Sequence, residues 1–422
     1  MKISNWNGRP KVDEARLLSI ENGWTPKGEF CPRGNGRSYG DASLQSEMLD
    51  LTKNKKTLKL NDTILEVSSG FSAGEALNFI VPKGFILPVI PGTQHATIGG
   101  MIAADIHGKN HAQNGTLGRW IESLKIGRPN GEIIDCSSQN NSQLFNTTIG
   151  GLGLTGVIIS AKIKLISLNS ITFQQNVQSF DQLNSLLDSL WKSDADYKTG
   201  WFDFYTMNTF LLIENRIKKG GEIPTDFQLK KPKISIPFKS VPFVQPFVMK
   251  AYNKRYAKKM LKPQNEVLLD DVLFPLDRIS NWNYLYGTRG FYQLQFQFER
   301  ENILPKIERI FEVIHASGFL PVLSVIKKHG TLHSPGILSF PKPGFSFAFD
   351  FIYKKGIEKT LQQLNEIIAE ESGQVYLVKD ALLSEKQFQK MYPEATQFKN
   401  QISEYNSGRI SSLLSKRLNL TP

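Results

Sequence analysis

Three glycine-dense stretches in the first part of the chain constrain its fold more than any other feature. They are RGNGRSYG (33–40), PGTQHATIGGMIAADIHGKN (91–110) and GGLGLTG (150–156). Glycine allows tight turns and close approach of the backbone to another group. Successive backbone N–H groups in such turns bind anions, and arginine adds bidentate contacts to phosphate. These turns therefore predict a site for a long, rigid, phosphate-bearing ligand, for which a dinucleotide cofactor is the natural candidate.

The first stretch does not match the common nucleotide-binding motifs. It lacks the GK[ST] ending of a Walker A loop, and no apolar strand precedes it as a Rossmann G-x-G-x-x-G would require. The sequence also contains no HxH, HExxH or CxxC spacing, so a metal site is not expected.

Composition narrows the class of protein. The chain has 422 residues with 27 Phe and 6 Trp, but only two cysteines, Cys31 and Cys136. The aromatic residues supply a core, and two cysteines exclude a disulfide scaffold. No apolar run approaches the ~20 residues needed to span a bilayer, and the N-terminus lacks the apolar stretch of a signal peptide. We expect a reduced, cytoplasmic protein of two domains.

The net charge of +12 is concentrated in one segment. Residues 216–262 hold thirteen Lys or Arg and two acidic residues, so this segment alone carries +11. Its basic residues are interleaved with Phe, Val, Ile, Met and Pro, a composition that suits the surface of an anionic membrane. A solvated loop is the alternative. Nucleic-acid binding is not expected, because no recognised nucleic-acid-binding module accompanies the segment.

The sequence pattern changes near residue 170. Before it, short strand patterns and glycine-rich turns predict an α+β region. After it, residues 291–299 (FYQLQFQFE) alternate as a half-buried strand does, and 345–353 (FSFAFDFIY) reads as a further strand. Residues 302–318 and 355–373 have the amphipathic pattern of helices. This succession predicts an antiparallel sheet covered by helices on one face.

The glycine-dense stretches, in this order, resemble the vanillyl-alcohol-oxidase-type (PCMH-type) FAD-binding family. The similarity is sharpest to its decaprenylphosphoryl-β-D-ribose 2′-oxidase subgroup, through RGNGRSYGDASL, DIHGKN and GGLGLTG. It continues through FPLD (274–277), WNYLYG (282–287), LSFPKPGF (338–345) and VYLVKD (375–380). The resemblance implies two domains with FAD at their junction.

The family layout implies three segments. Residues 1–169 would form the first part of the FAD-binding domain, 170–373 a substrate-binding domain that includes 216–262, and 374–422 a C-terminal part that completes the FAD-binding domain. The sheet flanked by helices would lie in the substrate-binding domain. The resemblance assigns these residues to FAD: Arg33, Gly34, Asn35, Gly36, Arg37, Ser38, Tyr39, Pro91, Gly92, Thr93, Thr97, Gly99, Gly100, Asp105, His107, Asn110, Gly115, Val157 and Tyr376.

The same resemblance implies a second set of residues before the flavin. Its substrate-binding members are Lys109, Gln293, Lys327 and Tyr286, and its catalytic members are Lys379, His107 and Gln295. Oxidation of a secondary alcohol moves a hydride to the flavin and a proton to a base. A partly desolvated lysine has a lowered pKa that suits it to take this proton, so Lys379 is the first candidate and His107 the second. Lys109, Lys327 and Arg37 are candidates to hold a sugar-linked phosphate.

The chain departs from the subgroup at three places. Ala348 stands where mycobacterial members carry a cysteine near the flavin, so inhibition through a thiol is not expected. Leu273–Phe274 replace a tyrosine–histidine pair. Gly36–Arg37–Ser38 stand where covalent members of the wider family carry a histidine, so FAD is expected to be bound non-covalently.

The resemblance implies FAD-dependent oxidation of the 2′-hydroxyl of a polyprenyl-phosphoryl-β-D-ribose to the 2′-keto sugar. This is the first half of an epimerisation to the arabinose form for arabinan and cell-wall biogenesis, which a separate NAD(P)H-dependent short-chain reductase completes. The implied location is cytoplasmic and peripheral on the inner face of the membrane, through 216–262. Two alternatives stay open: a soluble sugar, alditol or aldonolactone oxidase of the same superfamily, and a flavin-carrying scaffold without turnover.

Overall fold

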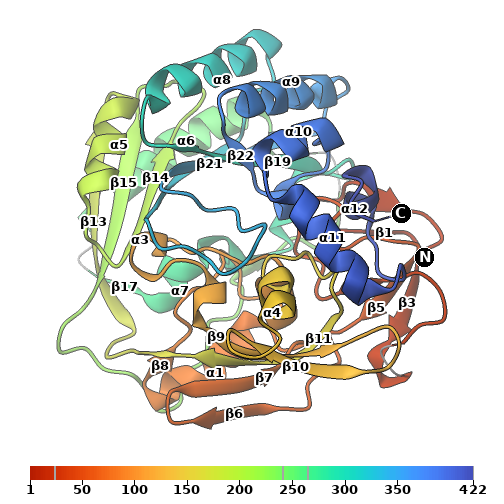
Figure 1. Cartoon of the computed structure of the whole chain (residues 1–422). Coiled ribbons are helices and arrows are strands. Elements are labelled where there is room, and N and C mark those ends of the chain that lie inside the picture. The colour runs from red at the N-terminus through yellow and green to blue at the C-terminus, as the bar shows by residue number, and fades with distance from the viewer. Residues whose placement is uncertain (23–24, 240–241, 264–265, 422) are drawn as a thin grey trace.

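The computed structural model describes the whole chain except residues 23–24, 240–241, 264–265 and 422 (Figure 1). Two antiparallel sheets dominate the fold, one of five strands in the first part of the chain and one of eight strands in the rest. Helices pack against both sheets, which confirms the α+β class that the sequence predicts.

The five-stranded sheet has the order β10-β9-β11-β7-β6. Its apolar side chains, including Val67 and Leu124, share a buried core with helices α1 and α2. Helix α1 begins at a capping box in which Ser72 and Glu75 each accept the other's backbone N–H. The bounds are β6 (Leu58–Asn61), β7 (Ile64–Ser68), β9 (Ile121–Gly127), β10 (Ile133–Ser137), β11 (Val157–Lys164), α1 (Ala73–Ile80) and α2 (Ile98–Ala103).

A parallel three-stranded sheet of order β3-β5-β4 leads into the first glycine-dense stretch, since this stretch leaves the end of β4. The C-terminal helices return to this part of the molecule. Phe30 forms a β-bridge with Ile410, and helix α11 packs against α4 (Figure 1). The bounds are β3 (Arg16–Ser19), β4 (Cys31–Arg33), β5 (Glu47–Asp50), α4 (Ser142–Thr148), α10 (Glu385–Met391), α11 (Ala395–Asn406) and α12 (Leu413–Arg417).

The eight-stranded sheet has the order β17-β13-β15-β14-β20-β21-β19-β22. Helices α8 and α9 cover one face of its β19–β21 region (Figure 1), where Phe347, Phe349 and Ile310 belong to the same hydrophobic core. The opposite face carries the site described below. The bounds are β13 (Thr172–Phe180), β14 (Tyr197–Phe202), β15 (Phe210–Ile217), β17 (Val267–Leu268), β19 (Phe291–Glu299), β20 (Leu323–His329), β21 (Gly344–Ile352), β22 (Gln374–Val375), α5 (Leu183–Lys192), α8 (Ile303–Ser317) and α9 (Ile357–Glu370).

Residue 374, where the sequence layout begins the C-terminal part, is the first residue of β22. This strand pairs with β19 inside the eight-stranded sheet.

No described helix combines the length and apolar character needed to cross a bilayer. The remaining elements are β1 (Ile3–Ser4), β2 (Lys11–Val12), β8 (Phe85–Ile86), β12 (Ile166–Ser167), β16 (Ile234–Ser235), β18 (Ile279–Ser280), α3 (His111–Asn114), α6 (Pro246–Met260), α7 (Leu269–Leu273), and short 3-10 turns that include η5 (Trp282–Tyr286) and η6 (Leu377–Lys379).

Candidate active site

A cavity of about 310 Å³ lies where the glycine-dense stretches meet the eight-stranded sheet. Its size is typical of a small-molecule site. Most residues that the sequence assigns to a cofactor or substrate line it. These are Arg33, Gly34, Asn35, Gly36, Arg37, Ser38, Tyr39, Pro91, Gly92, Thr93, Thr97, Gly99, Gly100, His107, Gln293, Gln295, Lys327, Tyr376 and Lys379.

The first glycine-dense stretch offers the cavity a row of backbone donors. Among the described residues, no hydrogen bond is recorded from the backbone N–H groups of 34–38. The stretch is anchored at one end by Arg33, whose guanidinium donates to Asn5 and to the Ser4 and Ser43 carbonyls. At the other end, a Cβ on Gly40 would lie 1.6 Å from the carbonyl oxygen of Asp380. The loop is therefore held rigidly while its N–H groups stay available.

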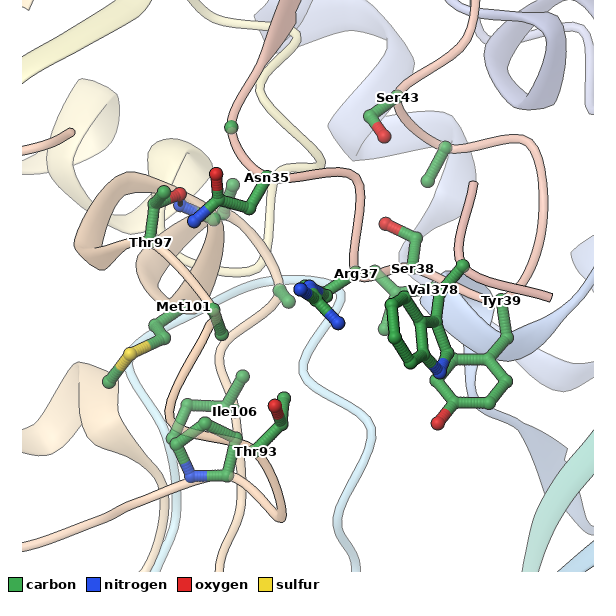
Figure 2. A pocket seen from close by; sticks show the side chains of 18 of the residues that line it. Asn35, Arg37, Ser38, Tyr39, Ser43, Thr93, Thr97, Met101, Ile106 and Val378 are labelled. Carbon is green, nitrogen blue, oxygen red and sulfur yellow. Dashed lines mark hydrogen bonds between the residues drawn. The ribbon is translucent and has the colours of Figure 1, made fainter. Parts of the chain in front are cut away.

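Arg37 projects among the cavity side chains, with Thr93 and Thr97 on one side and Tyr39 on the other (Figure 2). Its guanidinium lies 3.9 Å from the centroid of the Trp6 ring, and its buried Nε has no hydrogen-bond partner in the described part of the chain. Burial lowers the pKa of Arg37, opposed by the charge of Asp277. A half-buried guanidinium whose Nε lacks an acceptor among the described residues is suited to a phosphate.

Three strands of the eight-stranded sheet form one wall of the cavity. Strands β19, β20 and β21 pair in register, so that Gln293, Asp350 and Leu323 lie in one cross-strand row. The next row consists of Gln295, Ala348 and Val325. Because successive strand side chains point to opposite faces, each row presents its polar and apolar groups to the cavity side of the sheet.

His107 connects the wall to the glycine-dense part of the chain. The Gln295 side-chain amide hydrogen-bonds its Nε2 at 2.8 Å, and its Nδ1 is buried without a partner. Its ring lies 5.0 Å from the rings of His329 and Tyr376. Burial, aided by Lys327, holds the pKa of His107 well below its usual value, so the imidazole is neutral at pH 7.

Two lysines face the same cavity. Among the described residues, neither Lys327 nor Lys379 donates a side-chain hydrogen bond, and the Lys379 Nζ lies 3.3 Å from the centroid of the Tyr39 ring. Burial lowers the pKa of Lys327 to about 8 and that of Lys379 to about 7. Each ammonium group thus has donors for an oxygen of a ligand, and each can lose its proton near neutral pH.

Six predicted site residues do not line the cavity. Lys109 donates to the Val272 carbonyl, and Tyr286 donates to Asp350. The buried Asp105 accepts from Ser334, Ser339 and the Gly118 N–H, and Asn110 donates to the Pro88 carbonyl. The other two are Gly115 and Val157. The residues on either side of Val157, which are Gly156 and Ile158, do line the cavity.

Other cavity residues were missed by the sequence reasoning. Trp6 and Asp277 line the cavity, where Asp277 accepts from Thr93 Oγ1 and from the Gln94 N–H. Asp277 belongs to the FPLD motif (274–277), which offered a signal for it, whereas Trp6 lies in no motif.

The positions at which the chain departs from the subgroup, and its two cysteines, lie in different surroundings. Ala348 lines the cavity. Cys31 and Cys136 are buried away from the cavity, and Leu273–Phe274 are buried in the core.

The residues present fit a dinucleotide flavin. Gly92 and Gly153 border open space, because a Cβ at either would meet no atom within 4 Å. A ligand can therefore contact the backbone directly at these points. Together with the unpaired N–H groups of 34–38 and the free Nε of Arg37, they form an extended cradle for a diphosphate.

Comparison with known proteins agrees with this geometry. A family model described as an FAD-binding domain matches residues 25–137. The chain is 29% identical over 381 residues to decaprenylphosphoryl-beta-D-ribose oxidase of Mycolicibacterium smegmatis, covering 86% of this chain and 82% of that protein. It is 25% identical over 178 residues to D-arabinono-1,4-lactone oxidase of Yarrowia lipolytica, covering 40% of this chain and 34% of that protein.

The D-arabinono-1,4-lactone oxidase of Debaryomyces hansenii is 22% identical over 204 residues, covering 46% of this chain and 36% of that protein. The lactone oxidases thus match less than half of this chain, whereas the ribose oxidase matches most of it. The chain carries an FAD-binding domain over residues 25–137 and is an FAD-dependent oxidoreductase that acts on CH–OH groups.

Proposed function

We propose that this protein oxidises the 2′-hydroxyl of a polyprenyl-phosphoryl-β-D-ribose to the 2′-keto sugar. The observation that carries the proposal is the similarity to decaprenylphosphoryl-beta-D-ribose oxidase, which extends through the substrate wall of strands β19–β21. The cavity supports it chemically. Two lysines and the Nε of Arg37, none of which has an acceptor among the described residues, suit a substrate that combines hydroxyl groups with a phosphodiester.

In this proposal the chain's own residues handle the proton and the orientation of the sugar. FAD, when bound, supplies the hydride acceptor. Lys379 in its amine form takes the hydroxyl proton, while Gln293 and Gln295 bind neighbouring hydroxyl groups. Lys327 or Arg37 holds the phosphate. The neutral His107 keeps Gln295 in its orientation through their hydrogen bond.

The FAD is proposed to be non-covalent, since Gly36–Arg37–Ser38 offer no histidine at the covalent position. The proposed domain division keeps 1–169 and 374–422 around the flavin and assigns 170–373 to the substrate. The return of the C-terminal helices to the N-terminal part supports this division, for instance in the Phe30–Ile410 bridge.

The non-covalent attachment of FAD is tested by precipitation with trichloroacetic acid, which should release all of the flavin into the supernatant. Flavin that stays with the pellet would contradict non-covalent binding.

The reaction is tested by the anaerobic flavin spectrum. Polyprenyl-phosphoryl-ribose should bleach the yellow band of the wild-type protein, and ribose without the lipid phosphate should not. The second candidate function is oxidation of a free sugar or aldonolactone, which the shorter matches to the D-arabinono-1,4-lactone oxidases favour. It is tested by adding a free pentonolactone in place of the lipid-linked sugar. Bleaching by the lactone alone would replace the proposal with that candidate. If no alcohol or lactone bleaches the flavin band, the protein would be a flavin-carrying scaffold without turnover.

We also propose that the basic segment 216–262 docks on the cytoplasmic membrane surface, where a lipid-linked substrate resides. Of the eleven large hydrophobic side chains that are strongly exposed in the described chain, seven lie in this segment: Ile234, Phe238, Phe243, Phe247, Val248, Tyr252 and Leu261. Phe247, at the start of α6, is 76% exposed. Lysines and arginines are interleaved with them along the chain, which gives the apolar and cationic composition of an interfacial segment.

Vesicle binding tests this surface without substrate. The wild-type protein should sediment with vesicles rich in phosphatidylglycerol, bind phosphatidylcholine vesicles weakly, and dissociate in high salt. The double variant Phe243→Ser/Phe247→Ser should lose binding, whereas Leu17→Ser/Ile133→Ser, which also removes exposed apolar side chains, should retain it. Equal binding by both double variants would contradict the proposal. Dimerisation that only the first variant abolishes would assign the surface to a second copy instead.

The proposed 2′-keto product still needs reduction to the arabinose form, for which a separate NAD(P)H-dependent reductase is the proposed pathway partner. Adding such a reductase with NADPH should convert the keto sugar to the arabinose epimer. Accumulation of the keto sugar with every reductase tested would contradict this part.

A further inference from the structure

Trp6 lines the cavity beside Arg37, the second arginine of the first glycine-dense stretch. The Cζ atom of Arg37 lies 3.9 Å from the centroid of the Trp6 ring. At this distance the face of an aromatic ring attracts a guanidinium and restricts its orientation. The N–H donors of a guanidinium lie in its own plane, so a ring that covers one face leaves these donors available to a ligand.

Trp6 is itself held in place from two sides. Its backbone N–H donates to the Ser38 carbonyl at 3.2 Å, and its carbonyl accepts from Asn283 Nδ2 at 2.7 Å. Its ring meets Trp282 edge-on, with 5.6 Å between the centroids. Because Ser38 follows Arg37 in the chain, the backbone as well as the side chains joins Trp6 to this loop. The indole is therefore a fixed platform for the guanidinium.

The guanidinium of Arg37 retains a donor for a ligand. Its Nε is buried and has no hydrogen-bond partner within the described ranges. Asp277 is the acidic group whose charge favours the protonated form of Arg37. The oxygens of this carboxylate accept from Thr93 Oγ1 at 3.0 Å and from the Gln94 N–H at 2.7 Å. Asp277 thus supports the charge of Arg37 while its oxygens are bound to other donors.

We propose that Trp6 and Arg37 form a phosphate subsite, in which Arg37 binds a phosphate oxygen and Trp6 is the positioning residue that holds the guanidinium. Two sources share this chemistry, the diphosphate of FAD and the phosphodiester of the proposed lipid-linked substrate. The backbone N–H groups of 34–38, for which no hydrogen bond is recorded among the described residues, favour the diphosphate. The cofactor source rests on the FAD-binding domain, and only the substrate source rests on the proposed function.

Flavin titrations test the cofactor source without turnover. Protein stripped of FAD is titrated with FAD or with riboflavin, which has no phosphate, and quenching of flavin fluorescence gives the affinity. Trp6→Leu should weaken FAD binding about tenfold and leave riboflavin binding unchanged. Trp6→Phe keeps an aromatic ring and should recover most of the affinity. Trp191→Leu is the matched control, since Arg300 lies 4.9 Å from the Trp191 ring centroid at a place that does not line the cavity; it should change neither affinity.

A double-mutant cycle with Arg37→Met separates positioning from packing. If Trp6 acts through Arg37, Trp6→Leu should lower FAD affinity by less than about twofold once Arg37 is replaced. A tryptophan that only packs against Trp282 would cost the same in both backgrounds, and that result overturns the proposal. An equal loss of FAD and riboflavin binding overturns it as well. If Trp6→Leu does not fold, Trp6→Phe carries the same cycle with a smaller loss, because phenylalanine binds cations less strongly than tryptophan.

The substrate source is decided by kinetics if FAD affinity does not change in Trp6→Leu. The KM for polyprenyl-phosphoryl-ribose should then rise about tenfold with kcat unchanged, and polyprenyl phosphate should compete less well than in the wild-type protein. Unchanged FAD affinity together with an unchanged KM overturns the proposal. If the wild-type protein oxidises no ribose lipid, the proposed function fails, and the FAD titrations alone decide the subsite: an unchanged FAD affinity then overturns it.

Discussion

The side chains of His107 and Gln295 are hydrogen-bonded at 2.8 Å across 188 residues of sequence. His107 lies within the second glycine-dense stretch, and Gln295 lies on the central part of β19. Both line the cavity, so this contact joins the part of the chain that matches the FAD-binding domain to the wall proposed for the substrate.

Replacing Gln295 by Leu should destabilise the protein by about 1–3 kcal/mol, because His107 Nε2 would be left buried without a partner. Urea unfolding of the flavin-loaded protein measures this effect. Flavin reduction should slow as well, since the histidine loses its fixed orientation. Gln389→Leu on exposed helix α10 is the control and should change the midpoint little. Equal midpoints for the two variants would refute the role of the contact.

The fully buried His111 gives a pH-dependent prediction. Burial, aided by Lys327 and Arg119, lowers its pKa to about 4, whereas in the unfolded chain the pKa is about 6.5. Below pH 6.5 the unfolded chain takes up a proton that the folded chain refuses, so this contribution to stability is present above pH 6.5 and is lost as the pH falls. Between pH 7 and pH 5 the wild-type protein should lose about 2 kcal/mol more than His111→Gln.

Chemical denaturation at the two pH values measures this difference. His333→Gln, at an exposed position, supplies the matched control. If His111→Gln and His333→Gln lose stability in parallel between pH 7 and pH 5, the buried histidine is not the cause.

Arg417 pairs with the buried carboxylates of Asp41 and Asp380, at 2.8 Å and 2.9 Å. It thereby joins the C-terminal helix α12 to the first glycine-dense region and to the residues that follow η6. Arg417→Ala should cost about 3–5 kcal/mol, because two buried carboxylates lose their counter-charge. Thermal unfolding provides the measurement. Arg309 also pairs with two carboxylates, Glu370 and Glu371, but on the surface, so Arg309→Ala should barely move the melting temperature.

Substitutions at two glycines near the cavity should affect different properties, one the stability of the fold and the other the binding of the cofactor. A Cβ on Gly40 would lie 1.6 Å from the Asp380 carbonyl oxygen, so Gly40→Ala should destabilise the fold by about 1–3 kcal/mol or more. A Cβ on Gly92 would meet no protein atom within 4 Å and would occupy ligand space. Gly92→Ala should therefore keep the melting temperature of the flavin-free protein and lower its affinity for FAD, measured by quenching of flavin fluorescence. The reverse pattern would contradict the arrangement.

Local sequence was sufficient for several elements of the structure. The alternation in 291–299 predicts β19, and the amphipathic patterns in 302–318 and 355–373 predict helices where α8 and α9 lie. The glycine-dense stretches predict the cofactor loops, because turn chemistry depends on residues close in the chain. The match to an FAD-binding domain over 25–137 bears out this interpretation for the first two stretches.

Tertiary structure alone decided which polar groups face the cavity. Lys109 lies in the motif DIHGKN and Lys327 lies in a strand, and the sequence predicts a substrate-binding role for both. In the structure Lys109 donates to the Val272 carbonyl, whereas Lys327 lines the cavity. Asp350 appears in the sequence as one acidic residue in an aromatic strand, and only the pairing of β19 with β21 places it beside Gln293. The sequence by itself determined the cofactor loops and the secondary structure. Burial and cross-strand register, which depend on residues far apart in the chain, determined the protonation and partners of the groups that surround the cavity.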